Sequence, residues 1–227
     1  MSKRWMRALA GGAVAALLSA GSANAVLIGG VEFPQGAVSF ADSVISYQPG
    51  LAGADPGLNW QGAFNALGVP NFTGAGCSSQ IDCTYVSLGV GGALVLRFDD
   101  NVLTGSDSDA DDLWIFEIGP DVEDTTVDVS VDGVTWLSVG SVGGSTRGID
   151  IDFFGYDSSS AFRYVRLIDV AGEGAQSGAT VGADIDAVGA ISTRAVAVVP
   201  EPGTWALMIM GFGLAGAGLR SRRQAVA

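Results

Sequence analysis

Histidine is absent from this 227-residue chain. Its absence removes the usual general base at neutral pH, the relay residue of a catalytic triad and the commonest zinc ligand. The chain also lacks a G-x-S-x-G nucleophile elbow, a phosphate-binding G-K-[ST] loop and a metalloprotease histidine pair. Paired carboxylates could still hydrolyse glycosidic bonds, but no pair lies in a recognisable catalytic motif. The sequence therefore predicts a protein that is not an enzyme.

Basic residues are scarce. The chain has 11 lysines and arginines against 24 acidic residues, and between residues 26 and 199 only five arginines face 23 acidic residues. Such a surface repels the phosphates of nucleic acids and anionic membranes, and it attracts cations. The composition therefore predicts no nucleic-acid partner.

Cysteine is limited to Cys77 and Cys83, in the segment GAGCSSQIDC. Five residues separate the pair, whereas a thioredoxin-like motif has two. Both chain ends, described next, indicate export, and two nearby cysteines of an exported protein are expected to form a disulfide. A metal site built from two cysteines without histidine is a weaker alternative.

The N-terminus has the layout of a secretory signal peptide. Lys3, Arg4 and Arg7 precede an apolar run from Ala8 to Leu18, and small residues follow up to Ala25. The apolar run is too short to span a membrane comfortably, which disfavours a permanent anchor. We therefore expect a signal peptide at residues 1–25, export through the Sec pathway and cutting by signal peptidase after Ala25.

The C-terminus, residues 200–227, combines a short motif, an apolar stretch and a basic tail. These parts are Pro200, Glu201 and Pro202, then Thr204–Leu219, then Arg220, Arg222 and Arg223. As a helix the stretch reaches roughly 24 Å, slightly less than the ~30 Å hydrocarbon core of a bilayer. Its glycines disfavour a helix in water, and the arginines are expected to stay in the cytoplasm. The pattern predicts a transmembrane helix in the inner membrane, with a buried core helix as the alternative.

This segment, VPEPGTWALMIMGFGLAGAGLRSRR, resembles the PEP-CTERM sorting signal of Gram-negative bacteria. The resemblance implies that the chain is a substrate of an exosortase, a membrane-embedded cysteine protease-like enzyme that cuts near Pro-Glu-Pro. It further implies transient anchoring in the inner membrane, followed by sorting to the cell surface or the extracellular matrix.

The remaining body, residues 26–199, has the size of one globular domain. Alternation in GALVLRF and in FRYVRLIDV predicts half-buried strands, and LWIFEI at Leu113–Ile118 predicts a central strand. Val127–Val131, the turn Asp132-Gly133 and Thr135–Val139 predict a hairpin. Ile185–Ile191 is expected to form the closing strand.

Helical periodicity is nearly absent from this body. Gly50–Gly76 is typical of a loop, with a helical turn expected at Trp60–Leu67. Short strands joined by glycine-rich connections favour an all-β fold, namely an antiparallel β-sandwich of the jelly-roll type.

The body also has a second resemblance, through SLGVGGALVLRF, DDLWIFEIG, VDVSVDGVTWLSVG, FRYVRLIDV and GADIDAVGAI in that order. Together, across Tyr85–Ile191, these segments are similar to bacterial cell-surface modules related to discoidin or galactose-binding-like jelly rolls. The resemblance implies the fold more than a ligand, because such sandwiches bind sugars, lipids or proteins through variable loops.

Two groups of acidic residues suggest calcium as the cofactor. Asp107, Asp109, Asp111 and Asp112 precede the strand that carries Glu117. Calcium takes six to eight oxygen ligands from flexible loops. The spacing begins like an EF-hand, but Leu113 and an apolar strand follow where the turn glycine and distal glutamate should be. The alternative is a solvated acidic loop.

The second group is Asp184 and Asp186, expected on one face of a strand with Ile185 and Ala187 on the other. If this strand runs beside LWIFEI, Glu117 could join them. A structural ion, or an arginine partner such as Arg163 or Arg166, is an equal alternative to a ligand site. The run GIDIDFF, with Asp150 and Asp152, is typical of a half-exposed strand.

These observations favour an exported surface or matrix-associated protein that binds exopolysaccharide or other surface glycans, or mediates adhesion. The link to exopolysaccharide comes from the resemblance, because exosortase systems commonly accompany exopolysaccharide gene clusters. Trp60, Trp136, Tyr156 and Tyr164 could stack on sugar rings, although Trp136 after a turn is more typical of a core. The alternative is a structural surface protein without a small ligand, and a carboxylate-based glycoside hydrolase is third.

Overall fold

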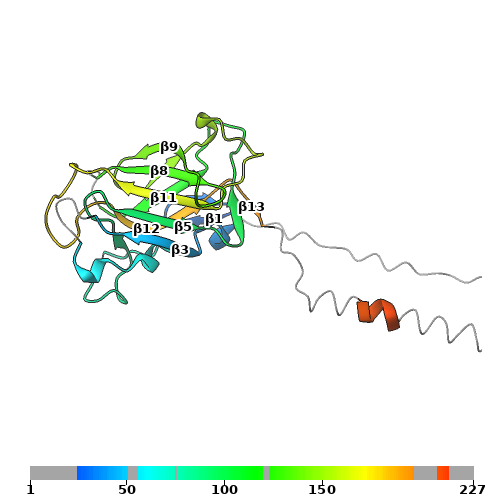
Figure 1. Cartoon of the computed structure of the whole chain (residues 1–227), viewed down its shortest axis with the longest axis horizontal. Helices are drawn as coiled ribbons and strands as arrows, with labels where there is room; N and C mark the ends of the chain where they lie inside the picture. Colours follow the sequence, from blue (N-terminus) through cyan, green and yellow to red (C-terminus); the bar gives the residue numbers. More distant parts are fainter. Residues whose placement is uncertain (1–24, 51–55, 75, 120–122, 197–208, 215–227) are drawn as a thin grey trace, which may run out of the picture.

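The computed structural model describes residues 25–50, 56–74, 76–119, 123–196 and 209–214 (Figure 1). Strands dominate this part of the chain, and every strand pair is antiparallel. The predicted signal peptide, the residues Pro200–Pro202 and the terminal arginines lie outside the described residues, apart from Ala25.

The larger sheet has five strands in the order β3-β5-β11-β8-β9 (Figure 1). Their bounds are β3 Ser43–Gln48, β5 Ala93–Arg97, β11 Tyr164–Asp169, β8 Thr125–Ser130 and β9 Leu137–Val142. The smaller sheet has four strands in the order β10-β7-β12-β4. Their bounds are β10 Arg147–Ile149, β7 Leu113–Glu117, β12 Asp184–Ala190 and β4 Val86–Ser87.

Two short strand pairs and four 3-10 turns complete the described fold. The pairs join β1 Val26–Ile28 to β2 Val31–Phe33, and β6 Asn101–Leu103 to β13 Thr193–Ala195. The turns are η1 Gly36–Ser39, η2 Leu58–Trp60, η3 Ala63–Ala66 and η4 Asp152–Phe154.

The main core lies between the two sheets. Alternate residues of the larger sheet, such as Leu94, Leu96 and Leu167, pack in one cluster with Ile115 and Ile185 of the smaller sheet. Their neighbours along each strand point to the opposite face, because successive side chains of a strand alternate. Each sheet thus buries one face against the other, and the predicted β-sandwich is confirmed.

A second cluster lies apart from the main core. Phe33, Phe40 and Phe116 pack together with Ala187, and the ring centroids of Phe33 and Phe40 are 4.6 Å apart. This cluster attaches the N-terminal segment to the smaller sheet, where Ala41 N–H donates to Val188 O at 3.0 Å.

Most strands predicted from the sequence are confirmed to within about two residues. The hairpin around Asp132-Gly133 joins β8 to β9, and the helical turn expected at Trp60–Leu67 appears as η2 and η3. The β1, β2 and β3 strands had no clear alternating pattern and were not predicted.

Two local predictions are wrong. The register shifts between Ile185 and Ala187, and these residues belong to different clusters rather than to one face. A β-bulge inserts an extra residue and breaks the two-residue alternation. In GIDIDFF the strand ends at Ile149, and Asp152 begins η4.

Among the described residues, no helix is long and apolar enough to cross a membrane. The helix predicted at Thr204–Leu219 lies mostly outside the described part, which includes only the helical residues 209–214.

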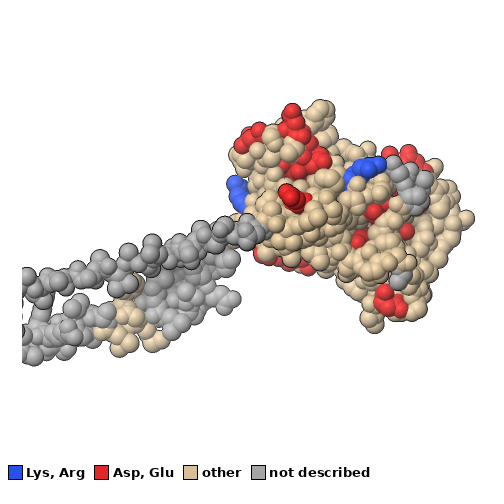
Figure 2. All heavy atoms as spheres, turned by 180° about the vertical axis from the view of Figure 1, so that it is seen from behind, with Lys and Arg blue, Asp and Glu red and all other residues tan. Residues whose placement is uncertain are grey.

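The disulfide between Cys77 and Cys83 is present, with a Cα–Cα distance of 4.6 Å. It closes a small loop beside β4. The surface reflects the composition: acidic side chains are spread over the face in Figure 2, whereas basic side chains appear at few places on it.

Candidate functional site

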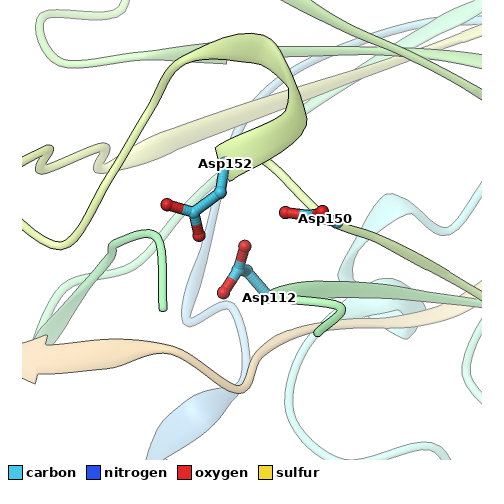
Figure 3. Close-up of side chains that lie close together, drawn as sticks. All are labelled: Asp112, Asp150 and Asp152. Carbon is cyan, nitrogen blue, oxygen red and sulfur yellow. The ribbon is translucent and has the colours of Figure 1, made fainter. Parts of the chain in front are cut away.

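Three carboxylates gather where β7 begins and β10 ends. Asp112, Asp150 and Asp152 each offer an oxygen, and these three oxygens lie within 4.8 Å of one another. Figure 3 shows the carboxylate of Asp112 directed toward the other two. Asp112 is fully buried, whereas Asp150 and Asp152 are half-buried.

The pairing of β7 with β10 produces this arrangement. Asp112 N–H donates to Ile149 O at 2.8 Å, which continues the ladder by one residue beyond the strands. The Ile151 N–H, between the other two aspartates, donates to Asp112 Oδ2 at 3.0 Å. The three carboxylates converge because the turn into η4 wraps around the Asp112 side chain.

Burial dominates the electrostatics of Asp112 in this group. The pKa of Asp112 is raised, chiefly by burial and to a lesser degree by the charge of Asp152. The pKa of Asp111, next to the group, is raised by burial and by the charge of Asp150. Asp112 Oδ1 is buried and has no hydrogen-bond partner among the described residues, although the hydroxyls of Ser106 and Ser192 lie close enough to lower the pKa.

Of the four acidic residues predicted in the loop before β7, only Asp112 belongs to this group. Asp107 has a positive φ of 58° and accepts the Ser158 N–H at 3.0 Å. Asp109 is exposed, and Asp111 is half-buried beside Gly148. Asp150 and Asp152 were not assigned to this group from the sequence, because placing them beside Asp112 requires knowing that β10 pairs with β7.

The second predicted group is brought together in part. Glu117 and Asp184 lie on the paired strands β7 and β12, and the Asp184 N–H donates to Glu117 Oε1 at 3.3 Å. Asp186 is directed elsewhere, because its carboxylate accepts the N–H groups of Asn71 and Phe72 at 3.1 Å. Among the described residues these three do not form a compact set of ligand oxygens.

Burial dominates the electrostatics of Asp184. It raises the pKa of Asp184 to about 7, the hydrogen bond from Ser87 opposes the rise, and the charges of Glu117, Glu123 and Asp169 add to it. All four carboxylates are buried. Glu123 and Asp169 carried no sequence signal, since each lies at a strand end far from the others along the chain.

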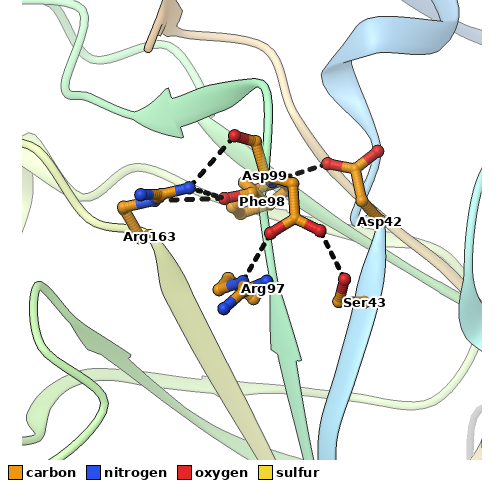
Figure 4. Close-up of polar contacts among 6 residues, drawn as sticks. All are labelled: Asp42, Ser43, Arg97, Phe98, Asp99 and Arg163. Atoms are coloured by element: carbon orange, nitrogen blue, oxygen red, sulfur yellow. Dashed lines mark hydrogen bonds and ion pairs between the residues drawn. The ribbon is translucent and has the colours of Figure 1, made fainter. Parts of the chain in front are cut away.

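Arg163 and Arg166, the arginines proposed as partners of Asp184 and Asp186, contact other groups instead. Arg166 pairs with Asp128 across β11 and β8, with a Nη2–Oδ2 distance of 2.6 Å. Arg163 donates to the carbonyls of Phe98 and Asp99, where Asp99 also contacts Ser43 and Arg97 (Figure 4). These contacts tie β3, β5 and β11 together at one end of the larger sheet.

A shallow hollow lies on the face of the larger sheet opposite the core. Its volume is about 290 Å³, and its lining includes Ser46, Gln48, Val95, Trp136, Arg166 and Ile168. An adjoining hollow of about 530 Å³ shares Gln48 and Ala93 with it and extends past Tyr47 to Val90. We refer to these two hollows, which share lining residues of β3 and β5, as the trough.

Trp136 is held over this trough by the β8–β9 turn. Asp132 Oδ1 accepts the N–H groups of Val134 and Thr135 at 2.8 Å, and Gly133 takes the positive φ of 75° that the turn requires. The Arg166 guanidinium carbon lies 4.5 Å from the Trp136 ring centroid. Trp136 is half-buried and packs on Arg166, so its expected core position is wrong.

The other candidate aromatics have different surroundings. Trp60 donates its indole N–H to the Tyr85 hydroxyl at 2.8 Å, and Tyr156 packs edge-on against Phe162. Of the four aromatics singled out in the sequence, Trp136 is the one that lines the trough.

Comparison with known proteins decides the nature of the C-terminus. Residues 198–223 match the PEP-CTERM protein-sorting motif. The chain carries a PEP-CTERM motif. The match contains Pro200, Glu201 and Pro202 together with Arg220, Arg222 and Arg223, as the resemblance predicted. The PEP-CTERM motif implies export, membrane-anchored sorting to the cell surface and processing by an exosortase, with this chain as the substrate.

The rest of the chain is distantly similar to a solved structure. No curated protein matches the sequence. Among solved structures, the C-terminal domain of a chitobiase from Bacteroides fragilis is similar, with 14% sequence identity and a TM-score of 0.37. That similarity covers 72% of this chain and 97% of the other.

Proposed function

We propose that this PEP-CTERM protein is an exported surface or matrix-associated protein that binds exopolysaccharide through the trough on its larger sheet. The observation that carries the proposal is the half-buried Trp136 ring beside Arg166 and Gln48 at the wall of that trough. The Arg166 guanidinium covers one face of the Trp136 ring. A sugar ring would pack its C–H groups on the other face, while its hydroxyls bond to polar groups such as Gln48.

The charge of the body narrows the glycan to a neutral one. Asp128 already neutralises Arg166, and residues 26–199 carry a large acidic excess. A polyanionic chain would be repelled at long range. Because two neighbouring hollows share Gln48 and Ala93, we favour a polymer segment over a single sugar as the ligand.

We further propose that the protein has no catalytic activity of its own. Asp184 is buried beside Ser87 on the smaller sheet, and among the described residues the linings of the two hollows include no acidic side chain that could act as a general acid. Turnover of the polysaccharide that a single Asp or Glu substitution abolishes would contradict this proposal.

The test is binding of the full chain, purified in a mild detergent, to exopolysaccharide isolated from the producing organism. We expect saturable binding that fragments of the same neutral polysaccharide inhibit. The assay is run with calcium and with excess chelator, to separate glycan recognition from any bridging by cations. Absence of saturable binding in both conditions would contradict the proposal and favour a structural surface protein.

A further inference from the structure

We propose that Asp112, Asp150 and Asp152 bind a calcium ion that joins the start of β7 to the turn between β10 and η4. The proposal does not rest on glycan binding. Calcium–oxygen distances of about 2.4 Å allow two ligands of one ion to lie at most about 4.8 Å apart. The three carboxylate oxygens satisfy this limit.

The unpartnered oxygen of Asp112 is the independent reason to infer a ligand. The side chain is fully buried, its Oδ2 accepts the Ile151 N–H, and its Oδ1 has no partner among the described residues. Leaving a buried charged oxygen without a partner is costly. The carboxylate that carries this oxygen is directed toward Asp150 and Asp152 (Figure 3), where a cation would satisfy it.

The surroundings can supply further oxygen ligands. The loop before β7 approaches the group with its backbone: a Cβ at Gly105 would lie 2.8 Å from both carboxylate oxygens of Asp152. Ser106 donates its N–H to Asp152 Oδ2 at 2.7 Å, and its hydroxyl lies 3.3 Å from the same oxygen. Because Asp150 and Asp152 are half-buried, water can complete the six to eight ligands that calcium takes.

Arg97, Arg163 and Arg166 are engaged elsewhere. Arg97 and Arg166 pair with Asp99 and Asp128, and Arg163 donates to backbone carbonyls. Three carboxylates held so close repel one another, and a divalent cation removes this repulsion.

The experiment is calorimetric titration of the chelator-treated full chain with calcium chloride alone. We expect a single bound ion, with the affinity weakened roughly tenfold or more by Asp150→Asn, because a lost ligand costs at least as much as a lost outer-shell partner. Asp112→Asn is expected to abolish binding. Because Asp112 is fully buried, Asp112→Asn could fail to fold. Asp150 is half-buried, so Asp150→Asn tests the proposal even in that case.

Asp109→Asn is the matched control, because it removes one charge from the adjacent acidic loop and leaves the group intact. At one fixed calcium concentration, calcium is expected to raise the unfolding temperature of the wild type and of Asp109→Asn by the same amount, and that of Asp150→Asn by less. Two results would overturn the proposal: no calcium binding by the wild type, or an affinity that Asp109→Asn weakens as much as Asp150→Asn does.

Discussion

The Arg166 guanidinium lies 4.5 Å from the ring centroid of Trp136 and also donates two hydrogen bonds to Asp128 Oδ2. Arg166 therefore contacts both Asp128, on the neighbouring strand β8, and Trp136, in the lining of the trough. The contact with Asp128 fixes the guanidinium, and the fixed guanidinium supports the indole ring. Cation–π contacts of this kind contribute about 0.5–2 kcal/mol.

Substitution of Arg166 is expected to destabilise the sheet. In Arg166→Gln the Asp128 side chain, only 10% exposed, would lose its cation. Breaking a buried pair costs about 3–5 kcal/mol, and because the Arg166 side chain is 30% exposed we expect about 2 kcal/mol. Urea denaturation measures this loss.

Arg97→Gln is the control for that experiment. It breaks the pair between Arg97 and Asp99, whose side chains are 35% and 37% exposed, respectively. Exposed pairs of this kind contribute about 1 kcal/mol or less. Adding Asp128→Asn to Arg166→Gln should restore part of the stability. Equal losses in the two single variants would contradict the importance assigned to the Arg166–Asp128 pair.

The pKa of Asp184 predicts a stability that falls as pH rises. Burial raises this pKa from 3.8 to about 7, so the folded state holds a proton that the unfolded state releases. The contribution of Asp184 to the free energy of unfolding is fully present below about pH 4, and it is lost progressively as the pH rises to about 7. At 1.36 kcal/mol per pH unit, the loss amounts to at most about 4 kcal/mol.

Asp184→Asn should abolish this dependence, because an amide does not ionise. In chelator, we expect the variant to be more stable than the wild type at pH 8, with the advantage shrinking at pH 5. Unfolding free energies of both proteins at the two pH values check the prediction. A difference that does not change with pH would show that Asp184 is ionised in the folded protein.

Loss of the disulfide should cost stability through the unfolded state. The Cys77–Cys83 bond closes a short loop, for which the chain-entropy estimate is about 2 kcal/mol. We expect Cys77→Ser/Cys83→Ser to unfold at lower temperature than the oxidised wild type. A reductant should lower the wild-type unfolding temperature and leave the double variant unchanged; a wild type insensitive to reductant would contradict the prediction.

The fold was predictable from the sequence wherever strands bury one face. The alternation of Leu94, Leu96 and Phe98, and of Val127 and Val129, gave their strands directly, because the core between the sheets selects every second residue. The alternation failed at Ile185 and Ala187, because a bulge cannot be seen in a pattern of residue types.

The candidate sites were less predictable than the fold. The sequence indicated Asp112 through the density of acids around it, but Asp150 and Asp152 join it only because β10 pairs with β7. The trough required the same knowledge of strand order, since Gln48, Trp136 and Arg166 come from distant segments of the chain. A site formed by residues from several strands depends on the order and register of those strands, and local sequence patterns do not predict either.

The central claim is that the trough beside Trp136 binds a neutral exopolysaccharide. The most direct measurement compares the affinity of the wild type, Trp136→Ala and Phe153→Ala for the isolated polysaccharide. Phe153 is 82% exposed and lies outside the trough, so it controls for unspecific contact with an aromatic ring. We expect Trp136→Ala to weaken binding about tenfold, as loss of a central aromatic contact does, and Phe153→Ala to bind like the wild type. Unchanged affinity in a folded Trp136→Ala protein would contradict the claim.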